Sequence, residues 1–139
     1  MDQTFHLKIK ACLETLAEIR DFVGDAALGL GLETAAVSDL KVAVDEAVTN
    51  VVIHGYQGKS GGLEINVERE GDDLIVRISD DAPSFSPENV PPPDLTAPLE
   101  SREIGGMGLH LMRTLTDALS YRPLPSGGNQ LTLVKKITN

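Results

Sequence analysis

Alternating apolar and polar positions predict five short β-strands along the chain. The alternating runs are residues 5–9, 63–67, 74–78, 119–121 and 131–137. The second and third runs flank a turn at residues 70–73, which predicts a hairpin, and residues 126–129 predict a turn before the last strand. These runs supply the strands of the expected sheet.

Apolar side chains at three- and four-residue intervals predict helices between these strands. The first helix covers residues 12–23, and Gly24 or Gly29 ends it. A third helix opens at residues 105–108 and turns its apolar side chains inward. Before it, residues 86–103 carry five prolines and almost no apolar periodicity. Such a long loop is typical of a mobile lid or a binding segment, and the alternative is a tolerated surface insertion.

The second helix is the element around which we expect the rest of the chain to be arranged. It covers residues 39–56, with Ser38 as its N-cap and Gly55 as its stop. Its apolar residues fall on one face at helical spacing, and Val42 and Ile53 add apolar groups on the opposite side. We therefore expect this helix to be covered nearly all round.

Two polar residues, Glu46 and Asn50, interrupt this apolar helix. An unpartnered buried carboxylate is costly, so Glu46 should face either a counter-charge or a wet ligand cavity. Asn50 lies one turn later on the same side, and His54 continues the row. A glutamate can accept the proton of a hydroxyl, and an asparagine carbonyl oxygen is a hard ligand that suits Mg²⁺. The alternative is a solvated helix edge.

The predicted order is β-α-α-β-β-lid-α-β-β. Its helices are too few and too unevenly placed for a doubly wound parallel sheet. We therefore expect an α+β fold, a two-layer sandwich in which helices cover one face of a mixed, mostly antiparallel sheet. At 139 residues the chain is long enough to bury one core, so we expect a single domain over residues 1–139.

Composition narrows the range of partners. A net charge of −9 leaves no surplus of Lys and Arg to neutralise a phosphate backbone, so we expect proteins or small molecules and no nucleic acid. The single cysteine, Cys12, excludes an internal disulfide and a cysteine-based zinc site. The N-terminus does not resemble a signal peptide, and no run approaches the ~20 apolar residues of a membrane span. A cytoplasmic protein with no membrane partner is expected.

Two further stretches suit a ligand. Asp80 follows a strand that we expect to be buried, where its carboxylate can accept a hydrogen bond from a donor such as the exocyclic amine of a purine. The alternative is that Asp80 only starts a turn. The glycines of residues 105–108 open a helix, where they let the backbone approach a ligand and where exposed N–H groups attract anions. This stretch is not a Walker A loop, which needs Gly-Lys-Ser/Thr.

Together, and in this order, the three stretches resemble the GHKL superfamily of ATP-binding domains. Residues 46–50, Glu-Ala-Val-Thr-Asn, resemble the N-box of that superfamily. Residues 80–85, Asp-Asp-Ala-Pro-Ser-Phe, resemble the G1 box, and residues 106–109, Gly-Met-Gly-Leu, the G2 box. The pattern of residues 45–56 is similar to that of the anti-sigma-factor serine kinases of bacteria. The resemblance covers nearly the whole chain.

The resemblance implies a Bergerat fold that holds Mg-ATP between the helices and a lid. It implies Glu46 as general base, Asn50 as the Mg²⁺ ligand, and Asp80 as the acceptor for the adenine amino group. The other residues that it implies in nucleotide binding are Ala82, Arg102, Gly105, Gly106, Gly108 and Leu109. Two further candidates are Met107, whose alternative is to plug the base of the lid, and Thr132, which can reach the nucleobase from the last strand. Ala82 and Ser84 stand where the G1 box usually has glycines, so we expect the turn beneath the adenine to differ.

By the same resemblance, the chain is an ATP-dependent serine/threonine protein kinase and anti-sigma regulatory factor. Its implied substrate is a STAS-type anti-anti-sigma protein, and its second implied partner is a sigma factor. Homodimers are also implied, with Phe5, Leu7 and Ile9 as candidate contacts. Two alternatives remain open: a nucleotide-binding interaction module that transfers no phosphate, and a detached histidine-kinase catalytic domain. The second is disfavoured because no histidine-bearing dimerisation helix precedes the domain.

Overall fold

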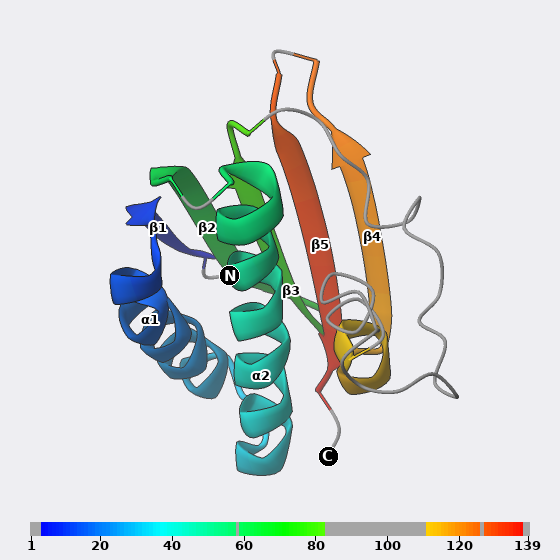
Figure 1. Ribbon diagram of the computed structural model, residues 1–139. Coiled ribbons are helices and arrows are strands. Elements are labelled where there is room, and N and C mark those ends of the chain that lie inside the picture. The colour runs from blue at the N-terminus through cyan, green and yellow to red at the C-terminus, as the bar shows by residue number, and fades with distance from the viewer. Residues whose placement is uncertain (1–3, 58, 83–110, 126, 138–139) are drawn as a thin grey trace, which may run out of the picture.

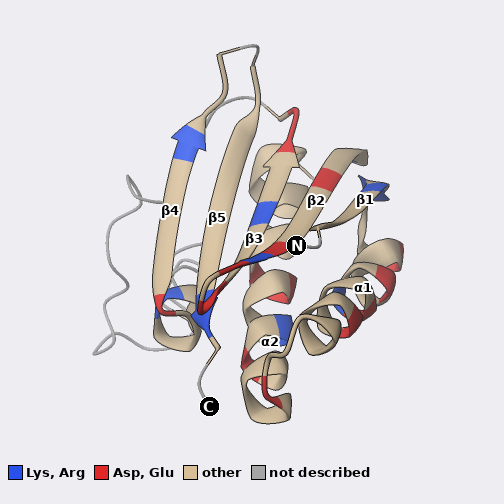
Figure 2. Ribbon diagram, turned by 180° about the vertical axis from the view of Figure 1, so that it is seen from behind, with Lys and Arg blue, Asp and Glu red and all other residues tan. Residues whose placement is uncertain are grey.

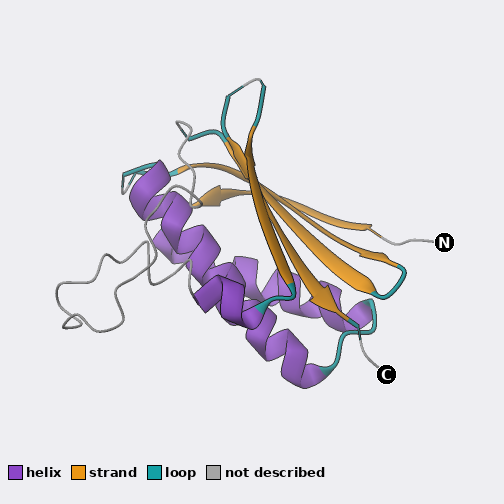
Figure 3. Cartoon of the chain, turned by 90° about the vertical axis from the view of Figure 1, so that its right-hand side faces the viewer, coloured by secondary structure: helices purple, strands orange, loops and turns teal. Residues whose placement is uncertain are grey.

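A computed structural model describes residues 4–57, 59–82, 111–125 and 127–137. In this part of the chain, a five-stranded sheet forms one layer and the helices pack on one of its faces (Figure 1). The strands are β1 (Thr4–Ala11), β2 (Gly61–Glu70), β3 (Asp73–Asp80), β4 (Ala118–Pro123) and β5 (Asn129–Lys136). The helices are the 3₁₀-helix η1 (Leu13–Thr15), α1 (Leu16–Gly29), α2 (Thr34–Asn50), the π-helix η2 (Val51–Gly55) and a helical turn at residues 111–115. The predicted α+β fold, with helices on one face, is confirmed (Figure 3).

The described sheet is antiparallel throughout, in the order β1-β2-β3-β5-β4. The prediction of a mostly antiparallel sheet is confirmed, and no pair of the described strands is parallel. The reason lies in the connection from β1 to β2, because α1 and α2 lead the chain away from the end of β1 and back again. Ala11, which ends β1, consequently pairs with Gly61, which begins β2. A single crossover helix would have made these two strands parallel.

The helix boundaries differ from those predicted in two places. Gly24 does not end α1, which continues to Gly29, the other predicted end. A Cβ atom at Gly24 would lie 2.2 Å from Cε of Lys41, so this glycine makes room for a side chain of α2. Helix α2 begins at Thr34 after the N-cap residue Glu33, whereas Ser38 is an exposed residue inside the helix. The predicted stop at Gly55 agrees with the end of η2.

Among the described residues, helix α2 is covered on two sides. Its buried face packs on the sheet, and α1 lies along another side (Figure 1). Val42 remains 43% exposed, and Ile53, in η2, remains 41% exposed. The expectation that this helix is covered nearly all round is therefore wrong, because the layer of helices is too narrow to enclose it.

The two faces of the sheet differ in chemistry. The helix face carries the core, whose largest fully buried side chains include Ile19, Leu40, Val44, Val48, Leu63, Ile65, Ile78 and Leu133. The outer face carries charges of both signs (Figure 2). Ion pairs on it join neighbouring strands and are Lys8–Glu64 at 3.3 Å, Lys136–Asp73 at 2.8 Å and Arg77–Glu68. A ligand that needs a sheltered site is therefore expected on the helix side.

Several predicted features lie outside the described residues. They are the proline-rich loop at residues 86–103, Ser84, Arg102 and the glycine-rich helix start at residues 105–109. Within the described ranges, no helix combines the length and the apolar character that crossing a membrane requires.

Candidate functional site

A small cavity lies between the C-terminal part of α2 and the helix face of the sheet. Among the described residues, its walls are Ala47, Asn50, Val51, Ile78, Asp80, Met112, Tyr121, Asn129 and Leu131. Most of the lining is apolar, and a few polar groups converge on it, which is the usual composition of a small-molecule site. The enclosed space is about 20 Å³, enough for about one water, so a larger ligand requires the walls to open.

Asp80 is the buried acid of this cavity. It ends β3 and is only 5% exposed. Its Oδ1 accepts two hydrogen bonds, from the backbone N–H of Ala82 at 2.9 Å and from Nδ2 of Asn129 at 3.0 Å. Within the described part of the chain, no hydrogen bond reaches Oδ2. The carboxylate is thus fixed through one oxygen, while the other can accept a bond from a ligand.

Burial raises the pKa of the Asp80 carboxyl above its ordinary value, because the loss of water disfavours the charged form. The hydrogen bonds from Asn129 and Ala82 act in the opposite direction, and the charge of Asp81 raises the pKa further. An additional hydrogen-bond donor therefore stabilises the charged form of Asp80 more than it would stabilise an exposed aspartate. A ligand with an N–H group can supply such a donor to Oδ2 of Asp80.

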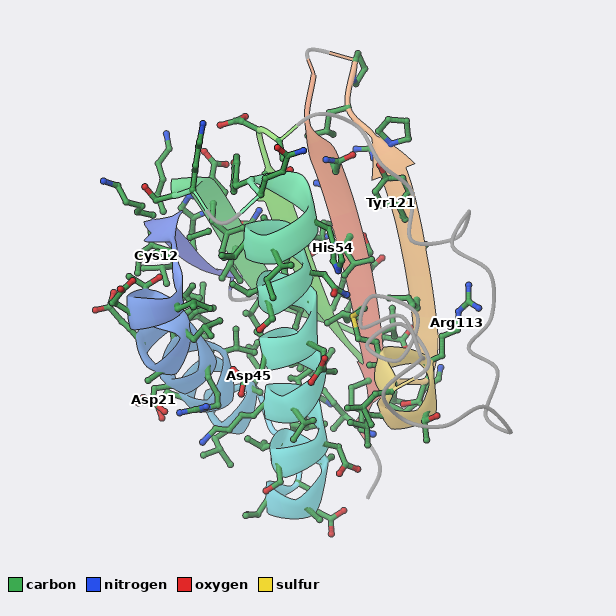
Figure 4. The ribbon with its side chains drawn as sticks, viewed as in Figure 1. Cys12, Asp21, Asp45, His54, Arg113 and Tyr121 are labelled. Carbon is green, nitrogen blue, oxygen red and sulfur yellow. The ribbon has the colours of Figure 1, made fainter. Side chains whose placement is uncertain are left out.

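Asn129 is a site residue that the sequence analysis missed. It was assigned to a turn, but it is the first residue of β5, directly opposite Asp80, and only 2% exposed. Its Nδ2 also donates to the backbone oxygen of Ala82 at 3.3 Å, and its Oδ1 accepts a bond from the hydroxyl of Tyr121 on β4. Figure 4 shows Tyr121 on that strand. Tyr121 and Asn129 thus hold Asp80 and the residues after it from one side.

Ala82 occupies the position where a glycine is usual in the G1 box. It is fully buried, and among the described non-glycine residues only Gln57 has a positive φ. Ala82 therefore does not need the positive φ that favours glycine. An alanine in place of the usual glycine is thus compatible with the backbone at this position.

The two polar residues of α2 differ in their position. Asn50 is 7% exposed and lines the cavity. Glu46, one turn earlier on the same side, is half-buried and is not among the described residues that line the cavity. The neighbouring Asp45 belongs to a different side, because its Oδ2 accepts a bond of 2.9 Å from Nη1 of Arg20 on α1 (Figure 4). Asn50 and Asp80 therefore line one cavity, whereas Glu46, which the resemblance implies in the same site, is not among its described lining residues.

His54 does not continue the row of Glu46 and Asn50. It is exposed, because the chain changes from α- to π-helix after Asn50. The backbone N–H of Tyr56 donates to the oxygen of Val51, five residues earlier, at 2.8 Å. Each π turn holds more residues than an α turn, so side chains four apart no longer align.

Thr132 lies on the outer face of the sheet and not beside Asp80. It is directly opposite Arg77 in the ladder, whereas Asn129 is opposite Asp80. Residues an odd number apart on a strand point to opposite faces, and Thr132 is three residues from Asn129. The structure therefore separates Thr132 from the cavity. The remaining residues implied by the resemblance, Arg102, Gly105, Gly106, Met107, Gly108 and Leu109, lie outside the described residues.

A magnesium ion would find few protein ligands at this cavity. No group of three His, Cys, Asp or Glu side chains in the described ranges is arranged to hold a metal. This suits Mg²⁺ that is held mainly by nucleotide phosphates and water, since such ions take only one or two side chains from the protein. The buried amide of Asn50 fits that role.

Comparison with solved structures supports the fold. A crystal structure of the RsbU and RsbW domains of a Mycobacterium tuberculosis protein superposes with a TM-score of 0.67 over 96% of this chain, which is 32% of that chain, at 18% sequence identity. At this identity the likeness concerns the fold alone.

Comparison with curated proteins finds similar sequences among serine-protein kinases RsbW and anti-sigma F factors. A serine-protein kinase RsbW of Listeria monocytogenes is 43% identical over 93 residues, which are 63% of this chain and 59% of the relative. Another, of Bacillus cereus, is 33% identical over 119 residues, 83% of this chain and 74% of the relative. An anti-sigma F factor of Thermoanaerobacter is 34% identical over 102 residues, 73% of this chain and 71% of the relative. The match thus spans less than two thirds of the Listeria relative.

The sequence model of one protein family matches almost the whole chain. Residues 9–135 match the histidine kinase-like ATPase domain. This match confirms the resemblance to the GHKL superfamily, and the names of the relatives agree with its anti-sigma-factor kinase branch. The chain belongs to the family of histidine kinase-like ATPase domains.

Proposed function

We propose that this chain binds Mg-ATP at the Asp80 cavity and transfers the γ-phosphoryl group to a serine or threonine of a STAS-type anti-anti-sigma partner. The observation that carries the proposal is Asp80, a buried acid fixed through Oδ1, with Oδ2 free of bonds from the described residues and with Asn50 on the same cavity. The names of the relatives, serine-protein kinase and anti-sigma factor, support the reaction and the class of partner.

The two ends of the site have different tasks. At the inner end, Oδ2 of Asp80 accepts a hydrogen bond from the adenine amino group, which a guanine cannot supply at the same position. At the outer end, Asn50 provides an amide oxygen for Mg²⁺, and a bound Mg²⁺ supplies positive charge to the phosphates. Glu46 lies one helical turn before Asn50 on α2, so it is close to the proposed phosphate end of the site.

Glu46 is the proposed general base. The hydroxyl oxygen of the partner forms a bond to the γ-phosphorus while the bond to the oxygen bridging the β- and γ-phosphates breaks, and ADP leaves. Glu46 accepts the proton of the hydroxyl. Its half-buried position beside the cavity, rather than within it, suits a group that meets a protein substrate arriving from outside.

Replacing the base tests this assignment. Glu46→Gln is expected to reduce phosphorylation of a STAS-domain partner by about 100-fold or more, the usual contribution of a general base, and to leave ATP affinity nearly unchanged. The measurement is transfer of label from ATP to the partner, together with calorimetric titration of Mg-ATP. Glu64→Gln is the matched control, because it makes the same change on the outer face, where Glu64 pairs with Lys8.

The outcomes of this experiment separate the two main functions. Transfer that disappears with Glu46→Gln and persists with Glu64→Gln supports the kinase. Tight ATP binding without any transfer by the wild type would identify a nucleotide-binding interaction module instead. Undiminished transfer by Glu46→Gln would exclude Glu46 as the base.

The raised pKa of Asp80 predicts a pH dependence of nucleotide selection. As pH falls from neutral toward the ordinary aspartate value of 3.8, folded Asp80 gains its proton before an unfolded one does. Its protonation stabilises the unliganded fold over that interval but weakens the acceptor for the adenine amino group. The affinity for ATP, relative to purine riboside triphosphate, which lacks the amino group, should fall in calorimetric titrations as the pH is lowered from neutral toward 3.8. A ratio that is constant with pH would contradict the role of Asp80.

Edge strand β1 is the proposed dimer contact. Its inward residues Phe5, Leu7 and Ile9 are only half-buried against the core, and β1 has a neighbour on one side only among the described strands. A second copy of the chain would cover these apolar groups. A sigma factor as further partner belongs to the same proposal and rests on the name of a relative, an anti-sigma factor. A cytoplasmic location is part of the same proposal.

A further inference from the structure

We propose that Tyr56 is a positioning residue for nucleobase selection: its hydroxyl ties the end of β3 to the start of β2 and thereby holds Asp80 in the orientation that recognises an amino-bearing purine. This inference rests on the proposed function and assigns part of its specificity to a side chain outside the cavity wall.

The hydroxyl of Tyr56 makes two hydrogen bonds. It donates to the backbone oxygen of Gly62 at 2.7 Å and accepts from the backbone N–H of Asp81 at 2.8 Å. Gly62 lies at the beginning of β2, and Asp81 directly follows Asp80 at the end of β3. One phenol thus connects the end of the α2–η2 helix with the ends of two strands, and we call this arrangement the Tyr56 clasp.

Two glycines at the start of β2 make room for the Tyr56 clasp, because a side chain at either position would lie close to the clasp residues. A Cβ atom at Gly61 would lie 2.2 Å from Cζ of Tyr56, so the ring rests directly on the backbone of that glycine. A Cβ atom at Gly62 would lie 3.2 Å from Oδ2 of Asp81. The π-helix sets where Tyr56 leaves the helix, because the N–H of Tyr56 donates to the backbone oxygen of Val51, five residues earlier.

Asp80 is consequently held from two sides. Tyr121 and Asn129 restrain it from β4 and β5, and the Tyr56 clasp restrains the following peptide from β2. These are the two tyrosines of the chain. Burial raises the pKa of Tyr56, so its hydroxyl keeps its proton at neutral pH and can continue to donate to Gly62. Because the clasp fixes the backbone next to Asp80, its loss should affect recognition of the base more than recognition of the phosphates.

The test removes the hydroxyl and keeps the ring. Affinities for Mg-ATP and for the magnesium complex of purine riboside triphosphate are measured by calorimetry in the full chain and in Tyr56→Phe. The wild type is expected to prefer ATP by about tenfold or more, the effect of one hydrogen bond to a charged acceptor. Tyr56→Phe is expected to lower this preference by about threefold or more, the effect of one lost hydrogen bond.

Val67→Ala is the matched control for lost stability. Val67 is a fully buried residue of β2 that pairs with Val76, far along the strand from Gly62, so its truncation weakens the same sheet away from Asp80. The preference for ATP should remain at the wild-type value in this variant. If Tyr56→Phe weakens both ligands equally, as Val67→Ala is expected to do, Tyr56 only stabilises the fold and the inference is wrong.

The failure of the proposed function gives a different result. A wild type that binds both triphosphates equally has no contact between Asp80 and the amino group. Should Tyr56→Phe not fold, hydrogen exchange of the wild type decides, because the Asp81 amide is protected if it donates to Tyr56. An Asp81 amide that exchanges as fast as an exposed loop amide would overturn the inference.

Discussion

Asp80→Asn is expected to lower the affinity for Mg-ATP by about 100-fold or more while the fold persists. The reason lies in the donors around this residue. Ala82 N–H and Asn129 Nδ2 both point at Oδ1 of Asp80. An asparagine side chain has one acceptor and one donor end. If its oxygen replaces Oδ1, its NH₂ group meets the adenine amino group; if it is reversed, its NH₂ group meets Asn129 and Ala82.

Either orientation leaves a buried donor against another donor. An unpaired buried donor costs about 1–3 kcal/mol, and the lost bond to a charged acceptor adds about 1.5–3 kcal/mol. Asp81→Asn is the matched control, because Asp81 is adjacent and exposed, and its known contact with Tyr56 uses the backbone N–H. Calorimetry of Mg-ATP binding and thermal melting measure the effects. If Asp80→Asn binds ATP within a factor of about three of the wild type, adenine is recognised elsewhere.

Local patterns predicted the helix side of Asn50 and the strand end at Asp80, and the resemblance to the GHKL superfamily is what implied a common site for the two residues. Helical spacing placed Asn50 on a definite side of its helix, and the position of Asp80 after a buried strand placed it at a sheet end. Both line one cavity in the structure. The helical position of Asn50 and the strand end at Asp80 follow from local periods and from the general rule that apolar faces pack together.

The contacts of Asn129 and Tyr56 could not be predicted from local sequence patterns. Asn129 reaches Asp80 because β5 pairs with β3 in one particular register, and the chain positions of the two residues differ by 49. Tyr56 reaches Asp81 because the helix changes to π geometry after Asn50. Neither the register nor the π turn follows from the spacing of apolar residues. The same limit explains Thr132, which a shift of one residue along β5 would have placed on the helix face.

The antiparallel pairing of β1 with β2 was also beyond local patterns. Strand periodicity predicts which residues face the core, and Phe5, Leu7 and Ile9 do face it. The direction of β2 relative to β1 depends on how many helices lie between them and how they turn. A two-helix connection returns the chain to the end of β1 that it left, and this becomes visible only in three dimensions.

Gly128→Ala is expected to destabilise the protein by about 3 kcal/mol or more and to weaken ATP binding with it. Gly128 has φ +91°, and a Cβ atom there would lie 2.1 Å from the backbone oxygen of Asp80 and 3.1 Å from Cα of Asp81. Both contacts are with backbone of the strand end, which cannot move without displacing the carboxylate. The turn into β5 would have to retreat, and Asn129 would lose its bond to Asp80.

Gly127→Ala provides a control that differs in one respect only. Gly127 has φ +98°, so an alanine there bears the same left-handed strain of about 1–2 kcal/mol, but its Cβ atom has no described neighbour within 4 Å. Urea unfolding of the two variants therefore separates backbone strain from the contact with Asp80. Equal losses would mean that the backbones of Gly128 and Asp80 do not touch. A larger loss for Gly128→Ala, with a matching loss of ATP affinity, would show that the close approach of β5 to β3 is what builds the nucleobase end of the site.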